Sequence, residues 1–218
     1  MKKNKLRPIN IVFYSKWDSF EKWRNIFINH NMNLYNWPDD FKKNSTYSNI
    51  NGALVWDPPD EIWKHFPNIK MNTVPHIDIV KFIEEQILKF EPNKIFTHHP
   101  SDLNDDHVHT AMSCLPAARL FQRRLDVKPI DAIYFMEILS STDWSFPTNK
   151  KNFEPDTFTD ITETLELKLQ ALSMYENVVK TAPHPRSIEV LTGHASSRGG
   201  QCGYRFAEAF QVAFKRGV

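Results

Sequence analysis

The spacing of apolar residues between positions 76 and 137 limits this chain to few folds. The segment predicts, in order, a helix over 76–90, a strand over 94–97, a helix over 108–124 and a strand over 130–137. The first helix rests on Ile79, Ile83 and Ile87, whose four-residue steps place them on one face. Strands that alternate with helices pair in parallel, so the pattern predicts an α/β fold.

The first 70 residues contain shorter patterns. They predict, in order, a strand over 9–14, a helix over 17–28, a strand over 33–37, a polar loop over 42–51 and a strand over 52–56. Asp57, Pro58 and Pro59 end the last of these strands, because a proline has no N–H to donate to a strand pair. This part of the chain is therefore also expected to be α/β.

The last third of the chain is expected to be helical. Asp160 and Glu163 resemble the start of a capping box. A helix is expected to follow, with Leu165, Leu169 and Leu172 on its buried face.

Residues 183–187, which include two prolines, are expected to interrupt this helical region. A final helix is predicted over 204–215. Its basis is the spacing of Phe206, Phe210 and Phe214, which would share one face.

Charge and composition favour a small-molecule partner. The chain has 218 residues, with 27 Lys and Arg against 26 Asp and Glu, so it has no electrostatic footprint for nucleic acid or an anionic membrane. No membrane span is expected, and the apolar run over 11–14 is too short for a signal peptide. Cys114 and Cys202 fit neither a disulfide framework nor a cysteine zinc site. A cytoplasmic protein is expected.

A cluster of histidines and aspartates follows the strand predicted over 94–97. The stretch from Thr97 to His109 contains four histidines and three aspartates. At the carboxyl end of a strand, such side chains can bind a divalent metal or act as a general acid and base. Their spacing matches no standard zinc signature. The alternative is a solvated loop in which Asp106 caps a helix that begins at His107.

Many separate short motifs occur between residues 72 and 215. They are Thr97-His98, Asp102-Leu103-Asn104 with Asp106-His107, Glu137, Ser140-Ser141-Thr142 with Trp144, Phe153 with Pro155, Lys168 with Ala171-Leu172 and Tyr175, Pro183-His184-Pro185-Arg186-Ser187, Arg198-Gly199 and Ala207-Glu208-Ala209-Phe210. In this order they resemble the PIG-L/LmbE-like deacetylases. The resemblance implies a Rossmann-like, three-layer α/β fold with a mainly parallel sheet. It also implies that a zinc-bound water hydrolyses the N-acetyl group of an amino sugar.

The resemblance assigns roles to individual residues of this chain. His107 stands at a zinc ligand, and Asn104 stands where some members carry a histidine that helps to polarise the acetyl carbonyl. Asp106 would support the imidazole or the loop, as ligand histidines require. Asn104 and Asp106 are therefore the candidate catalytic residues, and His98 and Asp102 are candidates either for substrate binding or for the metal.

Three residues further along are candidates for the substrate rim. They are His184, Arg186 and Arg198, which lie in the matching motifs. The alternative for all three is a salt-bridged helix terminus.

One motif of the family is missing. The family begins with a strand and His-Pro-Asp-Asp-Glu, which supplies its other metal ligands and its general base. Residues 37–40 contain only the Pro-Asp-Asp core of that motif. Residues 57–61, Asp-Pro-Pro-Asp-Glu, offer Asp57 and Asp60 as candidate metal ligands, but they place a proline where the base belongs.

Residues 1–70 have a resemblance of their own. The stretches over 10–14 and 53–56, followed by Pro58 and Pro59, are similar to the N-terminus of a D-2-hydroxyacid dehydrogenase of the glyoxylate/hydroxypyruvate reductase type. They contain neither that family's catalytic residues nor a Gly-rich dinucleotide loop. We therefore expect a chimaera of an N-terminal α/β segment (1–70) and a deacetylase-like segment (71–218).

Three functions follow as alternatives. The first is a zinc-dependent N-deacetylase that acts on an amino sugar or glycoconjugate. The second is an inactive remnant that binds a saccharide or a protein without turnover. The third is a reductase-like fragment that acts by associating with another chain. Zinc is the expected cofactor, and self-association into a homo-oligomer is left open.

Overall fold

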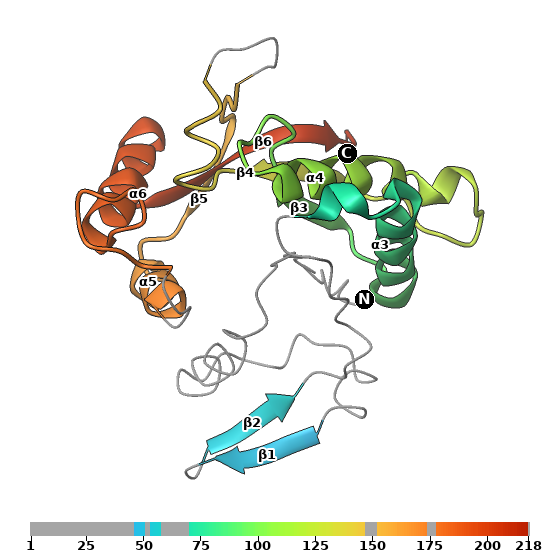
Figure 1. Cartoon of the computed structure of the whole chain (residues 1–218), viewed down its shortest axis with the longest axis horizontal. Helices are drawn as coiled ribbons and strands as arrows, with labels where there is room; N and C mark the ends of the chain where they lie inside the picture. The colour runs from blue at the N-terminus through green and yellow to red at the C-terminus, as the bar shows by residue number, and fades with distance from the viewer. Residues whose placement is uncertain (1–45, 51–52, 58–69, 147–151, 174–177, 218) are drawn as a thin grey trace, which may run out of the picture. The chain divides into compact units, whose positions relative to one another are not determined.

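The computed structural model describes residues 46–50, 53–57, 70–146, 152–173 and 178–217, which fall into two compact units (Figure 1). The first unit holds the described residues between 70 and 162 and between 192 and 217. The second holds those between 46 and 57 and between 163 and 191. The strand, helix and strand predicted over 9–14, 17–28 and 33–37 lie outside the described residues.

A four-stranded sheet forms the centre of the first unit, in the order β3-β4-β6-β5. Its strands are β3 (Lys94–His98), β4 (Ala132–Met136), β5 (Thr157–Asp160) and β6 (Ala207–Lys215). β3 and β4 pair in parallel, whereas β6 is antiparallel to both of its neighbours, β4 and β5. The α/β class is confirmed. The prediction of a mainly parallel sheet is not, because the described sheet is mixed.

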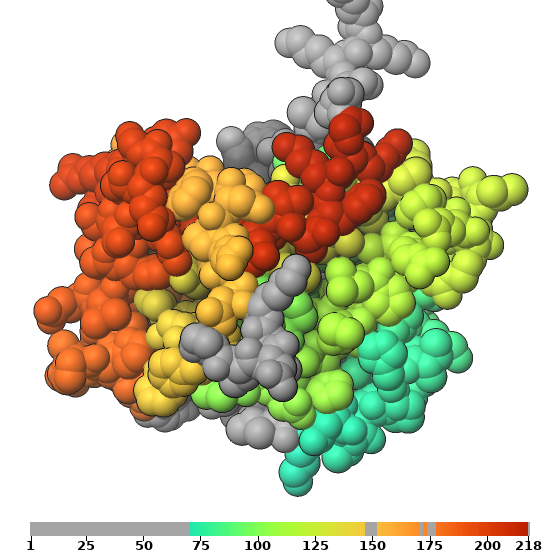
Figure 2. Space-filling view, turned by 90° about the horizontal axis from the view of Figure 1, so that it is seen from above, coloured from blue at the N-terminus to red at the C-terminus, as the bar shows by residue number. Residues whose placement is uncertain are grey.

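Two helices, α3 (His76–Phe90) and α4 (Asp105–Ala117), pack against each other in this unit (Figure 1). The bounds of α3 agree with the predicted helix, and Ile79, Ile83 and Ile87 are buried as predicted. α4 connects β3 to β4, and this crossover explains their parallel pairing. Figure 2 shows the α3 and α4 segments in contact at the surface of the unit.

The hydrophobic core of the first unit lies between these helices and the strands β3 and β4. Its buried residues are Met71, Ile79, Val80, Phe82, Ile83, Ile87, Ile95, Cys114, Ala117, Ala118, Leu120, Ile130 and Ile133. Burial raises the pKa of the Cys114 thiol to about 11, partly offset by a hydrogen bond with Thr97, so the thiol stays protonated at neutral pH. This core fixes the carboxyl ends of β3 and β4, where the polar loops begin.

Helix α4 begins earlier and ends earlier than predicted. Asn104 is its N-cap residue, and the side-chain Oδ1 of Asn104 accepts the backbone N–H of Asp106 at 2.9 Å. The alternative in which Asp106 caps the helix is therefore wrong, because Asp106 lies inside the first turn. Past Ala117 the predicted helix is replaced by a short 3-10 turn, η5 (Leu120–Gln122).

The prediction of a final helix over 204–215 is wrong, because the chain forms strand β6 there. A four-residue spacing fits one face of a helix, but it also fits one face of a strand, since four is a multiple of two. Helix α6 (Ile188–Cys202) precedes β6 and was not predicted from the sequence. Gly193, Gly199 and Gly200 lower its helix propensity and obscure its pattern.

The second unit contains a hairpin and a helix. β1 (Thr46–Ile50) and β2 (Ala53–Asp57) are antiparallel, which confirms the strand predicted over 52–56. The loop predicted over 42–51 is wrong where β1 forms. Helix α5 (Leu165–Ser173) follows its predicted pattern in part, with Leu165 and Leu169 buried.

Candidate functional site

Two loops meet at the carboxyl ends of β3 and β4. His98 ends β3 and pairs in register with Met136, the last residue of β4, so the segments that follow begin side by side. The backbone N–H of Leu103 donates to the Ser141 carbonyl at 3.3 Å and joins the two loops. The histidine-aspartate stretch and the Ser140–Thr142 motif therefore form one site, although about 40 residues of sequence separate them.

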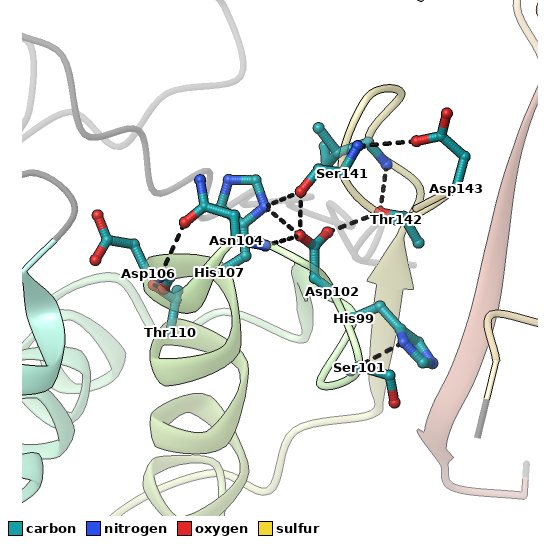
Figure 3. A network of polar contacts seen from close by, with 11 residues as sticks. His99, Ser101, Asp102, Asn104, Asp106, His107, Thr110, Ser141, Thr142 and Asp143 are labelled. Carbon is teal, nitrogen blue, oxygen red and sulfur yellow. Dashed lines mark hydrogen bonds and ion pairs between the residues drawn. The ribbon is translucent and has the colours of Figure 1, made fainter. Parts of the chain in front are cut away.

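Asp102 is the centre of this site (Figure 3). Its fully buried side chain accepts the Ser141 hydroxyl and the backbone N–H of Asn104 (2.8 Å) at Oδ1, and the Thr142 hydroxyl (2.8 Å) at Oδ2. Burial by itself raises the pKa of Asp102, but hydrogen bonds from His107, Ser141 and the Asn104 amide outweigh it and lower the pKa. Asp102 is therefore a buried carboxylate that stays ionised.

His107, in the first turns of α4, faces this carboxylate. Its Nδ1 lies 3.2 Å from Asp102 Oδ1 and 3.4 Å from the Ser141 hydroxyl. Because the carboxylate is an acceptor only, it favours the tautomer in which Nδ1 carries the hydrogen. The lone pair of a neutral His107 then resides on Nε2, and the side chain is 20% exposed.

His98 stacks on His107. The two imidazole rings have centroids 4.0 Å apart and planes 15° from parallel. Burial, together with the neighbouring His107, lowers the pKa of His98 to about 3 against an opposing effect of Asp102, so His98 is neutral at pH 7. Its Nδ1 is buried and has no hydrogen-bond partner among the described residues. The next residue, His99, points elsewhere and makes edge-to-face contacts with Phe135 and Phe153.

Asp106 and Asn104 occupy structural positions beside the imidazole. Asp106 is buried, and its Oδ1 accepts the backbone N–H of Met71 at 3.0 Å, which ties the segment before α3 to α4. Asn104 caps α4 and contacts Asp102 through its backbone N–H. The carboxylate that contacts His107 Nδ1 is thus Asp102, whereas the resemblance gave Asp106 the role of supporting either the imidazole or the loop.

A second polar cluster lies past the end of β4. Glu137 accepts Arg198 through both oxygens, at 2.6 and 3.0 Å, and also contacts His194 Nε2 at 2.9 Å. Burial by itself raises the pKa of Glu137, but hydrogen bonds from His194 and Arg198 outweigh burial, so the pKa is lowered overall. Arg198, a predicted rim residue, is therefore engaged in a bidentate pair that joins α6 to the end of β4.

His194 was not predicted as a site residue. It lies 57 residues after Glu137 in the sequence. The signal that could have revealed it is the four-residue spacing of His194 and Arg198, which places both on one face of α6.

The other candidates belong to the second unit or lie outside the described residues. The Arg186 N–H donates to His184 Nδ1 at 3.0 Å within a tight turn, and Arg186 Nε is buried without a hydrogen-bond partner in the described part of the chain. Asp57 is the last residue of β2, and Asp60 is not among the described residues. Roles for these four residues at the site stay predictions.

The described residues do not by themselves make a zinc site. A catalytic zinc requires about three protein ligands and one open position. Among residues 46–57, 70–146, 152–173 and 178–217, as far as they are described, no group of three or more His, Cys, Asp or Glu side chains could hold a metal ion. His107 offers one ligand atom, Nε2, with Nδ1 held by a carboxylate as ligand histidines commonly are.

Comparisons with known proteins show the fold. No protein-family model and no curated protein matches the chain. Among solved structures it is similar to the conserved protein TT1542 from Thermus thermophilus, with a TM-score of 0.52 and 18% identity over 71% of this chain and 66% of that one. This match spans just under two thirds of the Thermus protein. At that identity it shows a shared α/β fold.

Two further structures are similar at lower scores. GalB, the 4-carboxy-2-hydroxymuconate hydratase from Pseudomonas putida, has a TM-score of 0.49 and 21% identity, covering 65% of this chain and 60% of its own. N,N'-diacetylchitobiose deacetylase from Pyrococcus horikoshii also has a TM-score of 0.49, with 18% identity, covering 69% of this chain and 55% of its own.

Proposed function

We propose that this chain is an N-deacetylase of the PIG-L/LmbE type, which hydrolyses the N-acetyl group of an amino sugar or glycoconjugate. The observation that supports it best is the contact between Asp102 and His107, in which Oδ1 lies 3.2 Å from Nδ1. Asp102, His107, Ser141 and Thr142 come from two separate motifs that the sequence shares with that family, and they form one buried network. If the resemblance were due to chance, nothing would bring these motifs together in the folded chain.

The arrangement suits hydrolysis of an amide. An imidazole whose Nδ1 is held by a carboxylate presents the lone pair of Nε2, which serves either as a metal ligand or, when no metal is bound there, as the base for the attacking water. In the proposed reaction a water oxygen bonds to the acetyl carbon and the C–N bond breaks. The leaving nitrogen takes up a proton, and the products are acetate and the free amine.

Zinc belongs to this proposal as a cofactor to be tested. The described residues contain no group of three or more side chains that could hold a metal ion, so further ligands would have to join His107, and Asp57 and Asp60 are candidates from the sequence. No step of the proposed reaction is assigned to the metal. A zinc titration of the full chain will show whether the site is completed.

The second candidate is a saccharide-binding remnant without turnover. The scarcity of metal ligands among the described residues favours it. The dehydrogenase-like segment falls largely outside the described residues and stays a prediction, as do a cytoplasmic location and self-association. None of the described helices is long and apolar enough to cross a membrane.

Acetate release from the full chain tests the proposal. The purified protein is incubated with N-acetylglucosamine and with N,N'-diacetylchitobiose, once with added zinc and once with a chelator. We expect acetate release that is strongly slowed in His107→Ala but unchanged in His109→Ala, a matched histidine on the same helix whose Nε2 faces Asp105. Saccharide binding without acetate release would favour the remnant. The absence of both would contradict both candidates.

A further inference from the structure

Three large apolar side chains are exposed beside the Asp102 network. Leu103 is 61% exposed, Trp144 is 52% exposed and Phe146 is 59% exposed. Single exposed apolar residues are common on protein surfaces, but a group of them at a polar site indicates a contact surface. We call Leu103, Trp144 and Phe146 the apolar rim.

Backbone hydrogen bonds hold the apolar rim against the site. The N–H groups of Leu103 and Trp144 both donate to the carbonyl of Ser141, each at 3.3 Å, and the hydroxyl of the same Ser141 donates to Asp102. The N–H of Phe146 donates to the Trp144 carbonyl at 2.9 Å. The rim is therefore attached to the very residue that contacts Asp102 and His107.

The two rings of the rim also support each other. Trp144 and Phe146 pack edge to face, with ring centroids 5.2 Å apart and an interplanar angle of 64°. This is a preferred geometry for aromatic pairs, and it restrains both side chains. A restrained ring loses little conformational entropy when a ligand packs against it.

The neighbours of the rim are small and polar. Ser145 lies between Trp144 and Phe146 in the chain, Ser140 precedes them in the same loop, and the Asp143 side chain accepts the Ser141 N–H at 2.8 Å. The loop thus places flat apolar rings near hydroxyl and carboxylate groups of neighbouring residues, of which Figure 3 shows Asp143. A pyranose has the matching chemistry, because its C–H face is apolar and its hydroxyls lie around the edge. A plain alkyl chain would leave those polar groups without partners.

We propose that Trp144, together with Phe146 and Leu103, is a stacking subsite for a pyranose ring of the ligand, directly beside Asp102 and His107. The inference rests on the proposed function for its choice of an acetylated amino sugar. It adds that recognition of the sugar ring depends on the apolar rim, while the acetamide contacts the polar network around Asp102.

Ligand binding to the full chain tests this subsite apart from catalysis. Isothermal titration with N,N'-diacetylchitobiose compares the wild type with Trp144→Ala, Trp144→Phe and Leu125→Ala. Leu125 is a matched control, because it is apolar and 101% exposed but lies outside the rim. We expect Trp144→Ala to weaken the affinity about tenfold, Trp144→Phe to weaken it less, and Leu125→Ala to leave it unchanged.

A second ligand without a ring identifies the occupant. N-acetylbutylamine has the acetamide and an alkyl chain, and we expect its affinity to be the same in the wild type and in Trp144→Ala. An equal loss for both ligands would make the rim a general apolar contact and overturn the sugar assignment. If N,N'-diacetylchitobiose binds Trp144→Ala as tightly as it binds the wild type, the subsite is overturned.

The outcomes separate the subsite from the proposed function. Binding that depends on Trp144 without any acetate release supports the subsite and contradicts the deacetylase. Acetate release with an unchanged KM in Trp144→Ala supports the deacetylase and contradicts the subsite. Thermal unfolding of each variant verifies that these surface substitutions leave the fold intact.

Discussion

Asp102 and His107 meet through one pair of atoms, Asp102 Oδ1 and His107 Nδ1, which lie 3.2 Å apart. Asp102 is buried in the loop after β3, whereas His107 stands on α4, so the contact fixes the imidazole relative to the sheet edge. The same carboxylate accepts hydrogen bonds from Ser141, Thr142 and the Asn104 backbone. The four interactions make Asp102 the point at which the two loops and the helix are joined.

The tautomer of His107 is the first prediction. Long-range ¹H–¹⁵N correlation spectra at neutral pH will show Nδ1–H in the wild type, because Asp102 only accepts hydrogen bonds there. Asp102→Asn removes the charge and shifts His107 towards Nε2–H. His109, whose Nε2 faces Asp105 at 3.5 Å, is an internal control and keeps its spectrum in that variant. An Nε2–H tautomer of His107 in the wild type would contradict the assignment.

Thr142 donates a hydrogen bond to the same carboxylate, and we expect removal of its hydroxyl to destabilise the fold. Its hydroxyl donates to Asp102 Oδ2 and accepts the Ile138 N–H, both at 2.8 Å, in a buried position. Thr142→Val keeps the volume but removes both hydrogen bonds, so the free energy of unfolding should fall by about 2 kcal/mol. Thr142→Ser keeps the hydroxyl and should lose less. Urea unfolding of the two variants measures the difference, and equal losses would show that the hydroxyl is not the cause.

The Glu137 cluster makes stability dependent on pH. The pKa of Glu137 is lower in the folded chain than the ordinary 4.5, so its stabilisation is complete above pH 4.5 and is lost as the pH falls through the folded value. Glu137→Gln should lower the free energy of unfolding by about 2 kcal/mol at pH 7 and by progressively less as the pH falls below 4.5. Unfolding measured at pH 7 and at a series of lower pH values tests this, with the exposed Glu154→Gln as the control. A deficit that does not shrink in acid would contradict the ionic origin.

We expect the same Gly→Ala substitution to change the free energy of unfolding in opposite directions at two glycines of α6. A Cβ at Gly199 would lie 2.5 Å from the Tyr204 carbonyl oxygen and 2.8 Å from the Arg205 backbone. Gly199→Ala should therefore lower the free energy of unfolding by about 2 kcal/mol or more. A Cβ at Gly200 would meet nothing within 4 Å, so Gly200→Ala should raise it by about 0.5–1 kcal/mol. Equal effects in thermal unfolding would show that α6 does not pack on residues 204–205 as described.

The sequence predicted the fold well where one periodicity dominates. Ile79, Ile83 and Ile87 defined α3, and the strand patterns around α4 correctly indicated a parallel pair. The pattern failed at β6, because a four-residue spacing such as that of Phe206, Phe210 and Phe214 fits a regular strand as well as a helix, and the register shift in β6 is not visible in the sequence. Pairing with β4 and β5 decided that segment, and such long-range contacts are not visible in local spacing.

The sequence singled out His107 as a candidate ligand but did not predict the partner of its imidazole. Asp106 is adjacent in the chain, yet its side chain turns towards Met71, while Asp102 approaches from the preceding loop. Which carboxylate reaches Nδ1 depends on where α4 begins, and the cap at Asn104 determines that. His194 was missed because its partner, Glu137, lies on a different element.

A double-mutant cycle on acetate release tests the central claim that Asp102 acts through His107. Initial rates on N,N'-diacetylchitobiose are measured for the wild type, Asp102→Asn, His107→Ala and the double variant. We expect Asp102→Asn to slow release about 10- to 100-fold, His107→Ala to slow it further, and the double variant to be no slower than His107→Ala. Release at the wild-type rate by His107→Ala would contradict the claim, as would a double variant slowed by the product of the two single effects.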